Sequence, residues 1–241
     1  EMENAITGRA IPENDVYLQL ANGDADYPGM QSMAVEEFLE MHPELGFEIE
    51  GAELRLPEGS YEVAEDVIIP TGVLVVLEPG AEIRIAKGKS VVSYSDLDIR
   101  GTAEKPVVVS ALVEGEPFGV FAVLGNGKDS KTRIRNLHLG GGSEKFINGV
   151  FFSGQLSLYH TDVDILDSKI SNSASDDGLN IKYGHVRIEN TKFSNNSADQ
   201  ADLDFCTGTV SNSIFSAEEA NLGDGLDLSG STILVLSLIH I

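Results

Sequence analysis

The chain is poor in cysteine and in aromatic residues. It has one cysteine, Cys206, and no tryptophan, and aromatic residues make up 7% of its 241 residues. A single cysteine cannot form an intrachain disulfide, so the fold must be stable without one. Hydrophobic residues nevertheless account for 41% of the chain, which predicts a sizeable core built mainly from aliphatic side chains.

Several short motifs that mark large functional classes are also missing. The sequence contains no phosphate-binding loop and no Gly-x-Ser-x-Gly segment, and His138, His160 and His185 share no zinc-ligand spacing. No apolar run approaches the roughly 20 residues of a membrane-spanning helix. We therefore expect no membrane insertion.

Basic residues are scarce: 16 lysines and arginines face 39 aspartates and glutamates, for a net charge of -23. Phosphate groups are bound by positive charge, so this balance argues against nucleic acid as a partner. It is typical of a secreted protein, a salt-adapted protein or one that collects Ca²⁺. A solubilising acidic surface is the simplest explanation.

Residues 1 to 50 differ from the rest and contain one helical pattern, from Met33 to Met41. Ser32 is the expected N-cap, Glu36 and Glu37 fall in the first turn, and Pro43 should end the run. We predict a short α-helix that caps one end of a β domain. Because the chain begins with glutamate and shows no signal peptide, we expect it to be an internal piece of a longer protein.

From about Leu54 onward, short β-rich runs alternate with Gly, Asn, Asp and Ser, which predicts an all-β structure. Four segments share one frame: a β-branched residue, then Asn or Asp two positions later, then a large apolar residue five positions later. They start at Ile134, Ile165, Ile188 and Val210, which are 31, 23 and 22 residues apart. The longest interval carries the insertion Gly140-Gly141-Gly142.

A second frame lies between these segments. It comprises residues 177–181, 201–205 and 224–228, with 148–152 as an earlier copy. Two frames that recur about every 23 residues predict stacked coils of two or three strands, about 4.8 Å apart. Equivalent side chains should then form three inward columns. The first is Ile134, Ile165, Ile188 and Val210; the second is Leu139, Ile170, Phe193 and Phe215; the third is Leu179, Leu203 and Leu226. Asn172 and Asn195 fall at one turn, where Asn tolerates a left-handed backbone.

These repeats predict a right-handed parallel β-helix, that is, a single-stranded β-solenoid, with a short N-terminal α-helical cap. We expect an N-terminal segment at residues 1–50, the β-helix at 51–235 and a doubtful tail at 236–241. The regular coils should lie between about Ile134 and Ile233, after a looser first half. At Ile233 the first frame begins again and then fails, because Val235 and Leu236 stand where Asn212 and Ser213 stood. The tail is similar to translated adaptor sequence, so we expect it to be foreign; the alternative is a native, apolar last strand.

The phrases Leu77-Glu78-Pro79-Gly80-Ala81-Glu82-Ile83 and Gly101-Thr102-Ala103-Glu104-Lys105-Pro106-Val107 resemble the opening pattern of bacterial right-handed β-helix surface proteins. The resemblance covers roughly residues 54 to 233. Residues 177 to 231 also resemble β-helix regions attached to spore-coat CotH-like kinase domains. The kinase part has no counterpart here, so the resemblance implies a parallel β-helix and an extracellular or cell-surface location, without kinase activity.

The second frame suggests a metal site. If its leucines point inward, their polar neighbours point outward and stack one strand apart. Stacked carboxylates repel unless a cation lies between them, and Ca²⁺ prefers such oxygen ligands. We therefore weigh Ca²⁺ as a cofactor, against a solvated acidic face, with the candidate ligands Asn180, Asp202, Asp204, Asp224 and Asp227.

Catalysis is the other use of the same residues. In a Ca²⁺-dependent polysaccharide lyase, Lys182 or Arg187, which we expect to flank the acidic column, would take the proton. In a pectinase-like glycoside hydrolase, Asp176 and Asp177 would act as acid and base. The turn Asp176-Asp177 and the segment from Tyr183 faintly resemble polygalacturonase elements, but their spacing is compressed and a recurring turn explains Asp177-Gly178 better.

A non-catalytic module is therefore the function we expect: a rigid surface, adhesion or carbohydrate-associated scaffold of a larger secreted bacterial protein. Its expected partners are polysaccharide or other domains of the parent protein. A carbohydrate-active lyase or hydrolase is the alternative, since the same fold class serves both kinds of protein.

Overall fold

The structure is a computed structural model that describes residues 2–3, 10–11, 33–127, 129–216 and 223–240. Near the N-terminus, β1 (Met2–Glu3) pairs with β2 (Ala10–Ile11) in antiparallel fashion. The expected helix cap Ser32 lies outside the described residues.

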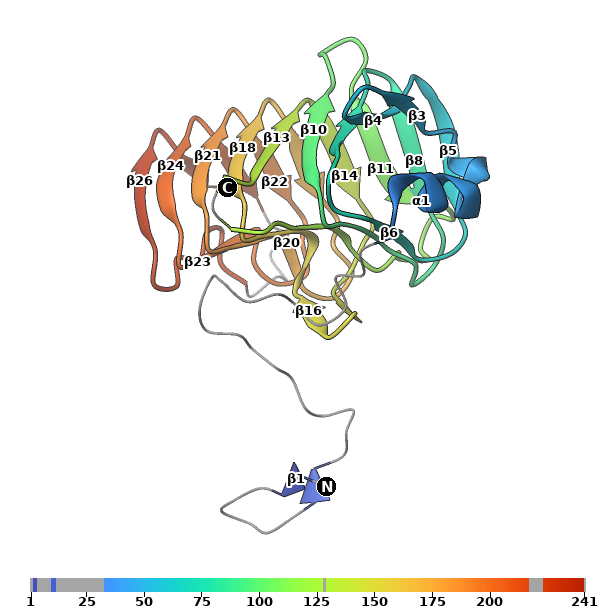
Figure 1. Ribbon diagram of the computed structural model, residues 1–241. Helices are drawn as coiled ribbons and strands as arrows, with labels where there is room; N and C mark the ends of the chain where they lie inside the picture. The colour runs from blue at the N-terminus through green and yellow to red at the C-terminus, as the bar shows by residue number, and fades with distance from the viewer. Residues whose placement is uncertain (1, 4–9, 12–32, 128, 217–222, 241) are drawn as a thin grey trace.

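From residue 48 to residue 240, the described chain is mostly β structure in three large sheets (Figure 1). The nine-stranded sheet contains, in spatial order, β26 (Thr232–Leu236), β24 (Thr207–Ser211), β21 (His185–Glu189), β18 (Asp162–Leu166), β13 (Lys131–Arg135), β10 (Asp96–Arg100), β7 (Leu74–Leu77), β4 (Glu53–Leu56) and β3 (Glu48–Glu50). The eight-stranded sheet contains β27 (Ile239–His240), β25 (Ile214–Ser216), β22 (Lys192–Ser194), β19 (Lys169–Ser171), β14 (Leu137–Gly140), β11 (Val107–Ala111), β8 (Ala81–Ile85) and β5 (Gly59–Val63). The six-stranded sheet contains β23 (Ala201–Asp204), β20 (Asp177–Lys182), β17 (Gly154–Tyr159), β12 (Phe121–Leu124), β9 (Val91–Ser93) and β6 (Val67–Ile69).

From β4 onward, successive strands of the large sheets visit these sheets in rotation, first the nine-stranded, then the eight-stranded and then the six-stranded one. We call each set of three such strands a rung. Neighbouring rungs pair strand on strand in parallel, and only β3 runs antiparallel to its neighbour β4. The all-β prediction with stacked parallel strands is confirmed. The first half is as regularly paired as the second, so the expectation of a looser first half was wrong.

The core lies between the three sheets and is built from columns of aliphatic side chains. Ile134, Ile165, Ile188 and Val210 pair in register, as predicted, and so do Leu139, Ile170, Phe193 and Phe215. The rings of Phe193 and Phe215 stack with centroids 4.9 Å apart. Burial of apolar surface in these columns is the main stabilising contribution, at about 25 cal/mol for each Å² removed from water.

The corners between sheets explain the Asn and Asp positions of the first frame. The residue after each strand of the nine-stranded sheet adopts a left-handed backbone at Asn136, Asp167, Asn190 and Asn212, with φ between 47° and 52°. Asn172 and Asn195 do the same at the next corner, as predicted, with φ of 58° and 56°. Asn and Asp tolerate this region because their short polar side chains bond locally.

The third corner uses larger residues that the sequence pattern did not reveal. His160, Tyr183 and Phe205 have φ of 54°, 59° and 54°, and their rings stack in sequence 4.8 and 5.1 Å apart. Ring stacking between rungs therefore fixes a corner where the backbone geometry alone would be unfavourable.

An antiparallel hairpin occupies the longest repeat interval. It consists of β15 (Lys145–Ile147) and β16 (Val150–Phe152). Residues 148–152 are therefore not an earlier copy of the second frame, and β17 supplies that strand instead. Phe152 is buried in a second apolar cluster on the outer face of the six-stranded sheet, with Val92, Ala122 and Leu124. The hairpin thus covers part of that face.

The α-helix α1 (Val35–Met41) and the 3-10 helix η2 (Pro43–Leu45) lie at the end of the stack near β5 (Figure 1). Glu36 and Glu37 are in the first turn of α1, as predicted. Phe38 is fully buried and belongs to the main core cluster, which supports the predicted capping role. No helix in the described residues is long and apolar enough to cross a membrane.

At the opposite end, β26 pairs two residues out of the predicted alignment. Val235, not Ile233, pairs with Val210, so Ser237 takes the corner position of Asn212 with φ of 52°. The repeat frame therefore continues where we expected it to fail. Ile239 pairs with Ile214, which extends the eight-stranded sheet into the tail. The foreign origin of residues 236–241 stays a prediction.

Candidate functional site

The predicted polar column lies on the outer face of the six-stranded sheet, but in a different register. Asn180 pairs with Asp202, and Asp202 forms a bridge to Asp227. Asp204 pairs with Lys182 instead. The inward column Leu179, Leu203 and Leu226 was therefore wrong, because Ala201 is the partner of Leu179 and Leu203 is the partner of Ile181.

A slip of two residues explains this error. Side chains alternate with a period of two, so a two-residue shift leaves every side chain on its own face of the sheet. Leu179, Ile181 and Leu203 all belong to the main core cluster, and their outward neighbours stay outward. The apolar pattern fixes the face but not the partner.

Asn180 and Asp202 form the most buried polar pair of this face. Asn180 has no exposed surface, and its Nδ2 donates a hydrogen bond of 2.7 Å to Asp202 Oδ2. The other oxygens of both side chains, Asn180 Oδ1 and Asp202 Oδ1, are buried without a hydrogen-bond partner in the described structure. Leaving such atoms unpaired costs free energy.

Lys182 and Asp204 form the neighbouring pair, with Nζ and Oδ2 2.9 Å apart. Nζ also lies 5.5 Å from the ring centroid of Tyr159, on the preceding rung. Arg187 does not join them. It lies in β21 of the nine-stranded sheet and pairs with Glu189 at 2.5 Å, so the expectation that Lys182 and Arg187 flank the same column was wrong.

The aspartates before these strands bond to the backbone of the next rung. Asp177 Oδ1 accepts a hydrogen bond of 3.2 Å from Asp199 N, and Asp199 Oδ1 accepts one of 2.6 Å from Asp224 N. Asp224 is exposed, and Asp176 is partly buried at the same turn. These carboxylates hold the turns of successive rungs together, which gives the recurring Asp a structural reason.

Burial and crowding of like charges raise the pKa of several of these carboxyl groups. Burial, followed by the charge of Asp176, raises the pKa of Asp177 to about 8. Burial, followed by the charges of Asp204 and Asp227, raises the pKa of Asp202 to about 7. Both groups therefore hold a proton over part of the neutral range, because their environment disfavours the charged form.

In the described part of the chain, no three His, Cys, Asp or Glu side chains are grouped so that they could hold a metal ion. The five predicted Ca²⁺ ligands spread over three rungs, and Asp204 is engaged by Lys182. Calcium binding by Asn180, Asp202, Asp224 and Asp227 stays a prediction.

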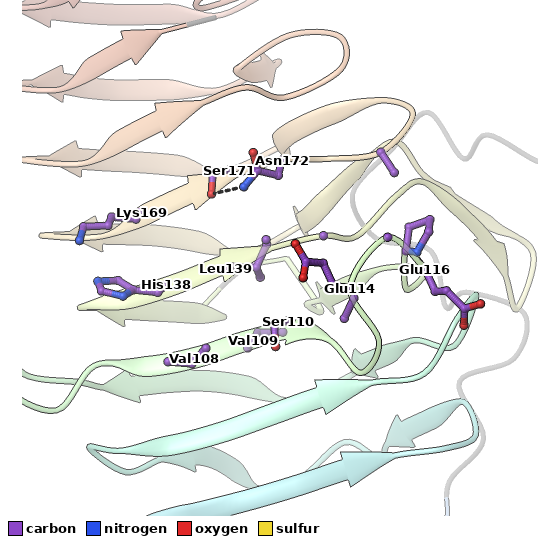
Figure 2. Close-up of a pocket in the computed structure, with 16 residues that line it drawn as sticks. Val108, Val109, Ser110, Glu114, Glu116, His138, Leu139, Lys169, Ser171 and Asn172 are labelled. Atoms are coloured by element: carbon purple, nitrogen blue, oxygen red, sulfur yellow. Dashed lines mark hydrogen bonds between the residues drawn. The ribbon is translucent and has the colours of Figure 1, made fainter. Parts of the chain in front are cut away.

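A second candidate site is a groove of about 820 Å³ on the outer face of the eight-stranded sheet (Figure 2). Strands β11, β14 and β19 form its floor, and the loop from Glu114 to Pro117 forms one wall. Figure 2 shows His138 and Lys169 on one side and Glu114 and Glu116 on the other. Such a volume falls within the range of ligand-binding sites in proteins.

Two polar columns begin on this floor and continue beyond the groove onto β22 and β25. His138 pairs with Lys169 and Lys169 with Lys192, which gives a basic column. The second column consists of Ser171, Ser194 and Ser216, which pair in register on successive rungs; we call it the serine column. On the rungs before it, Gly140 and then Ser110 occupy the same position. Burial and the charge of Lys169 lower the pKa of His138, so the lysines supply most of the positive charge.

Sequence analysis missed this groove although its signal was present. His138, Lys169 and Lys192 each occupy the fifth position of the first frame, one residue before the large apolar residue. In the repeat frame these basic positions alternate with the inward apolar residues, so they predict only an outward-facing polar side chain. The loop that walls the groove belongs to no repeat and could not be placed from the pattern.

Comparison with known proteins identifies no relative: no family model, no curated protein and no solved structure matches this chain.

Proposed function

We propose that this chain is a right-handed parallel β-helix module of a larger extracellular bacterial surface protein, and that it acts as a rigid, non-catalytic, carbohydrate-associated scaffold. The observation that carries the proposal is the rotation of successive strands through three parallel sheets from β4 to β25, after which β26 and β27 extend two of these sheets. Right-handed connections between parallel strands are the strong general preference. The resemblance of residues 54 to 233 to bacterial β-helix surface proteins supports the location.

Rigidity follows from the way the rungs bond to one another. Each rung is hydrogen-bonded to its neighbours along three faces, and Asp177 and Asp199 add side-chain bonds to the backbone of the next rung. A chain built in this way contacts only its neighbours along one axis, which produces an elongated body with long uninterrupted faces.

The ion pairs of Lys182 and Arg187, the two residues considered as a lyase base, support a non-catalytic role. A lyase base must be free to accept a proton from the substrate. Lys182 is paired with Asp204, and Arg187 is paired with Glu189 on a different sheet. Neither residue is placed as a free base beside Asn180 and Asp202.

Glycoside hydrolysis is a second candidate function, favoured by the raised pKa of Asp177 and of Asp202. A carboxyl group that stays protonated near neutral pH can act as a general acid. Asp177 is only 5% exposed, however, and its Oδ1 accepts a backbone hydrogen bond, which limits the access of a sugar.

Turnover assays distinguish the two functions. The chain is incubated with pectate, alginate and neutral glucans, with and without Ca²⁺, beside an active lyase and an active hydrolase as positive controls. Ultraviolet absorbance detects unsaturated products, and a reducing-end assay detects hydrolysis. We expect no product in any reaction and an elongated particle in small-angle X-ray scattering. Turnover that is lost in Asp177→Asn or Asp202→Asn would overturn the scaffold proposal.

A further inference from the structure

The basic column of the eight-stranded sheet is unusual for a chain with a net charge of -23. His138, Lys169 and Lys192 stack on three successive rungs, so their positions repeat about every 4.8 Å. Like charges at this spacing repel one another. A column of this kind is stabilised when negative charge lies against it.

The protein itself does not provide that charge in the described residues. Its lysine ion pairs involve Lys87, Lys89, Lys105, Lys131 and Lys182. Lys169 and Lys192 take part in no ion pair there, and both are exposed. Glu114 and Glu116 line the far side of the groove (Figure 2), and Glu116 lies 3.9 Å from Lys87.

Hydroxyl groups run beside the basic column. Ser171, Ser194 and Ser216 occupy equivalent positions on successive rungs and are partly exposed. Gly140 and Gly141 leave the floor between the serines and the loop open. A ligand along this face therefore meets one lysine and one serine on each of the β19 and β22 rungs, with His138 on the rung before them and Ser216 on the rung after them.

We propose that the basic column and the serine column together bind a linear anionic polysaccharide, such as a polyuronate, that lies across the rungs and places carboxylates against Lys169 and Lys192. This inference rests on the carbohydrate-associated scaffold role and names its ligand. The sugar carboxylates pair with Lys169 and Lys192, His138 adds a hydrogen bond, and the sugar hydroxyl groups bond to the serines.

The serine column favours this ligand over an acidic peptide. Each unit of a polyuronate carries hydroxyl groups beside its carboxylate, so the sugar can bond to the serines and to the lysines together. The side chains of an acidic peptide supply carboxylates but no hydroxyl groups. Nucleic acid is disfavoured because the whole chain is strongly acidic.

Calorimetry with hexamers of galacturonate tests the proposal. EDTA is included so that no divalent cation bridges the sugar to the acidic column. The full chain is compared with K169A/K192A and with the control K105A/K131A, which removes the same charge from lysines outside the basic column. We expect binding to the full chain that weakens with salt, about tenfold weaker binding to K169A/K192A, and binding to the control within about twofold.

Three outcomes would overturn the proposal: no binding to the full chain, equal losses in the two double variants, or equally tight binding of neutral maltohexaose. Polyglutamate or single-stranded DNA that binds as tightly as the uronate would also contradict it. Thermal melts confirm that each variant is folded. If no uronate binds, the scaffold role still stands and only its ligand is wrong. If the turnover assays find product, the scaffold role is wrong, but a measured binding of uronate to the basic column still stands.

Discussion

Asn180 and Asp202 face each other across strands β20 and β23, joined by a hydrogen bond of 2.7 Å from Nδ2 to Oδ2. One oxygen of each side chain is buried without a partner in the described structure. The pair therefore combines a close contact with an unfavourable environment for charge. The charge on Asp202 should therefore lower the free energy of unfolding, which makes stability depend on pH.

The first prediction concerns the pH dependence of this pair. Burial and the charges of Asp204 and Asp227 raise the pKa of Asp202 to about 7 in the folded chain, against about 3.9 in an unfolded chain. Between these values the folded state binds more protons than the unfolded state, so stability falls as pH rises. Asp202→Asn keeps an acceptor for Asn180 and removes the titration.

Near pH 8 we expect Asp202→Asn to have a free energy of unfolding about 1 kcal/mol higher than that of the native chain, measured by urea denaturation. This value allows for the partial exposure of Asp202. Near pH 5 the two proteins should differ little. Asp164→Asn is the matched control, because it breaks an ion pair of 2.8 Å with Lys131 on the nine-stranded sheet, away from Asp202, and should have the same small effect at both pH values. A loss of stability in Asp202→Asn near pH 8 would show that the charged form is favoured there.

The second prediction concerns the left-handed corners. Asn190 has φ of 51°, and its exposed side chain donates a hydrogen bond of 3.2 Å to Asp167. Alanine disfavours this backbone region by about 1 kcal/mol relative to asparagine, whereas glycine adopts it freely. We expect Asn190→Ala to lower the free energy of unfolding by about 1 kcal/mol and Asn190→Gly to lower it by less. Equal losses in urea denaturation would mean that the hydrogen bond, not the backbone, matters.

The first frame could be predicted well because each position in it has its own physical demand. Ile165 and Ile188 must fill the core, Asp167 and Asn190 must adopt a left-handed corner, and these demands recur at a nearly constant interval. Few other residue types satisfy a left-handed corner, so the signal was specific. The prediction of stacked coils with two or three strands each followed from it.

The second frame was harder to align because its strands carry only the alternating pattern. Nothing in the sequence distinguishes Leu179 opposite Leu203 from Leu179 opposite Ala201, since both choices bury apolar side chains. The turns before each strand decide the partner, and their lengths vary from rung to rung. The same ambiguity displaced Ile233 by two residues from its predicted partner Val210.

The candidate sites depended on these registers. The Asn180–Asp202 contact and the Lys182–Asp204 ion pair required the correct alignment of β20 and β23, so the predicted pairing of these residues was wrong. The groove on the eight-stranded sheet required the wall from Glu114 to Pro117. That loop belongs to no repeat and is placed by tertiary packing alone.

The third prediction concerns the cap at the start of the stack. Phe38 has no exposed surface, and its ring lies 5.1 Å from that of His42 and 5.8 Å from that of Phe47. It covers core side chains of the first rung that have no preceding rung to pack against. Phe38→Ala leaves a cavity at this end, and such changes in a core cost about 3–5 kcal/mol.

Met41, at the end of the same helix, is 56% exposed and provides the matched control, because Met41→Ala should change stability by less than about 0.5 kcal/mol. Urea denaturation gives both values, and hydrogen exchange locates the effect. In Phe38→Ala the amides of β4 and β5 should exchange faster while those of β21 and β24 stay protected, since the rungs contact only their neighbours. If Phe38→Ala were as stable as Met41→Ala, or if exchange increased evenly along the stack, α1 would not be the cap.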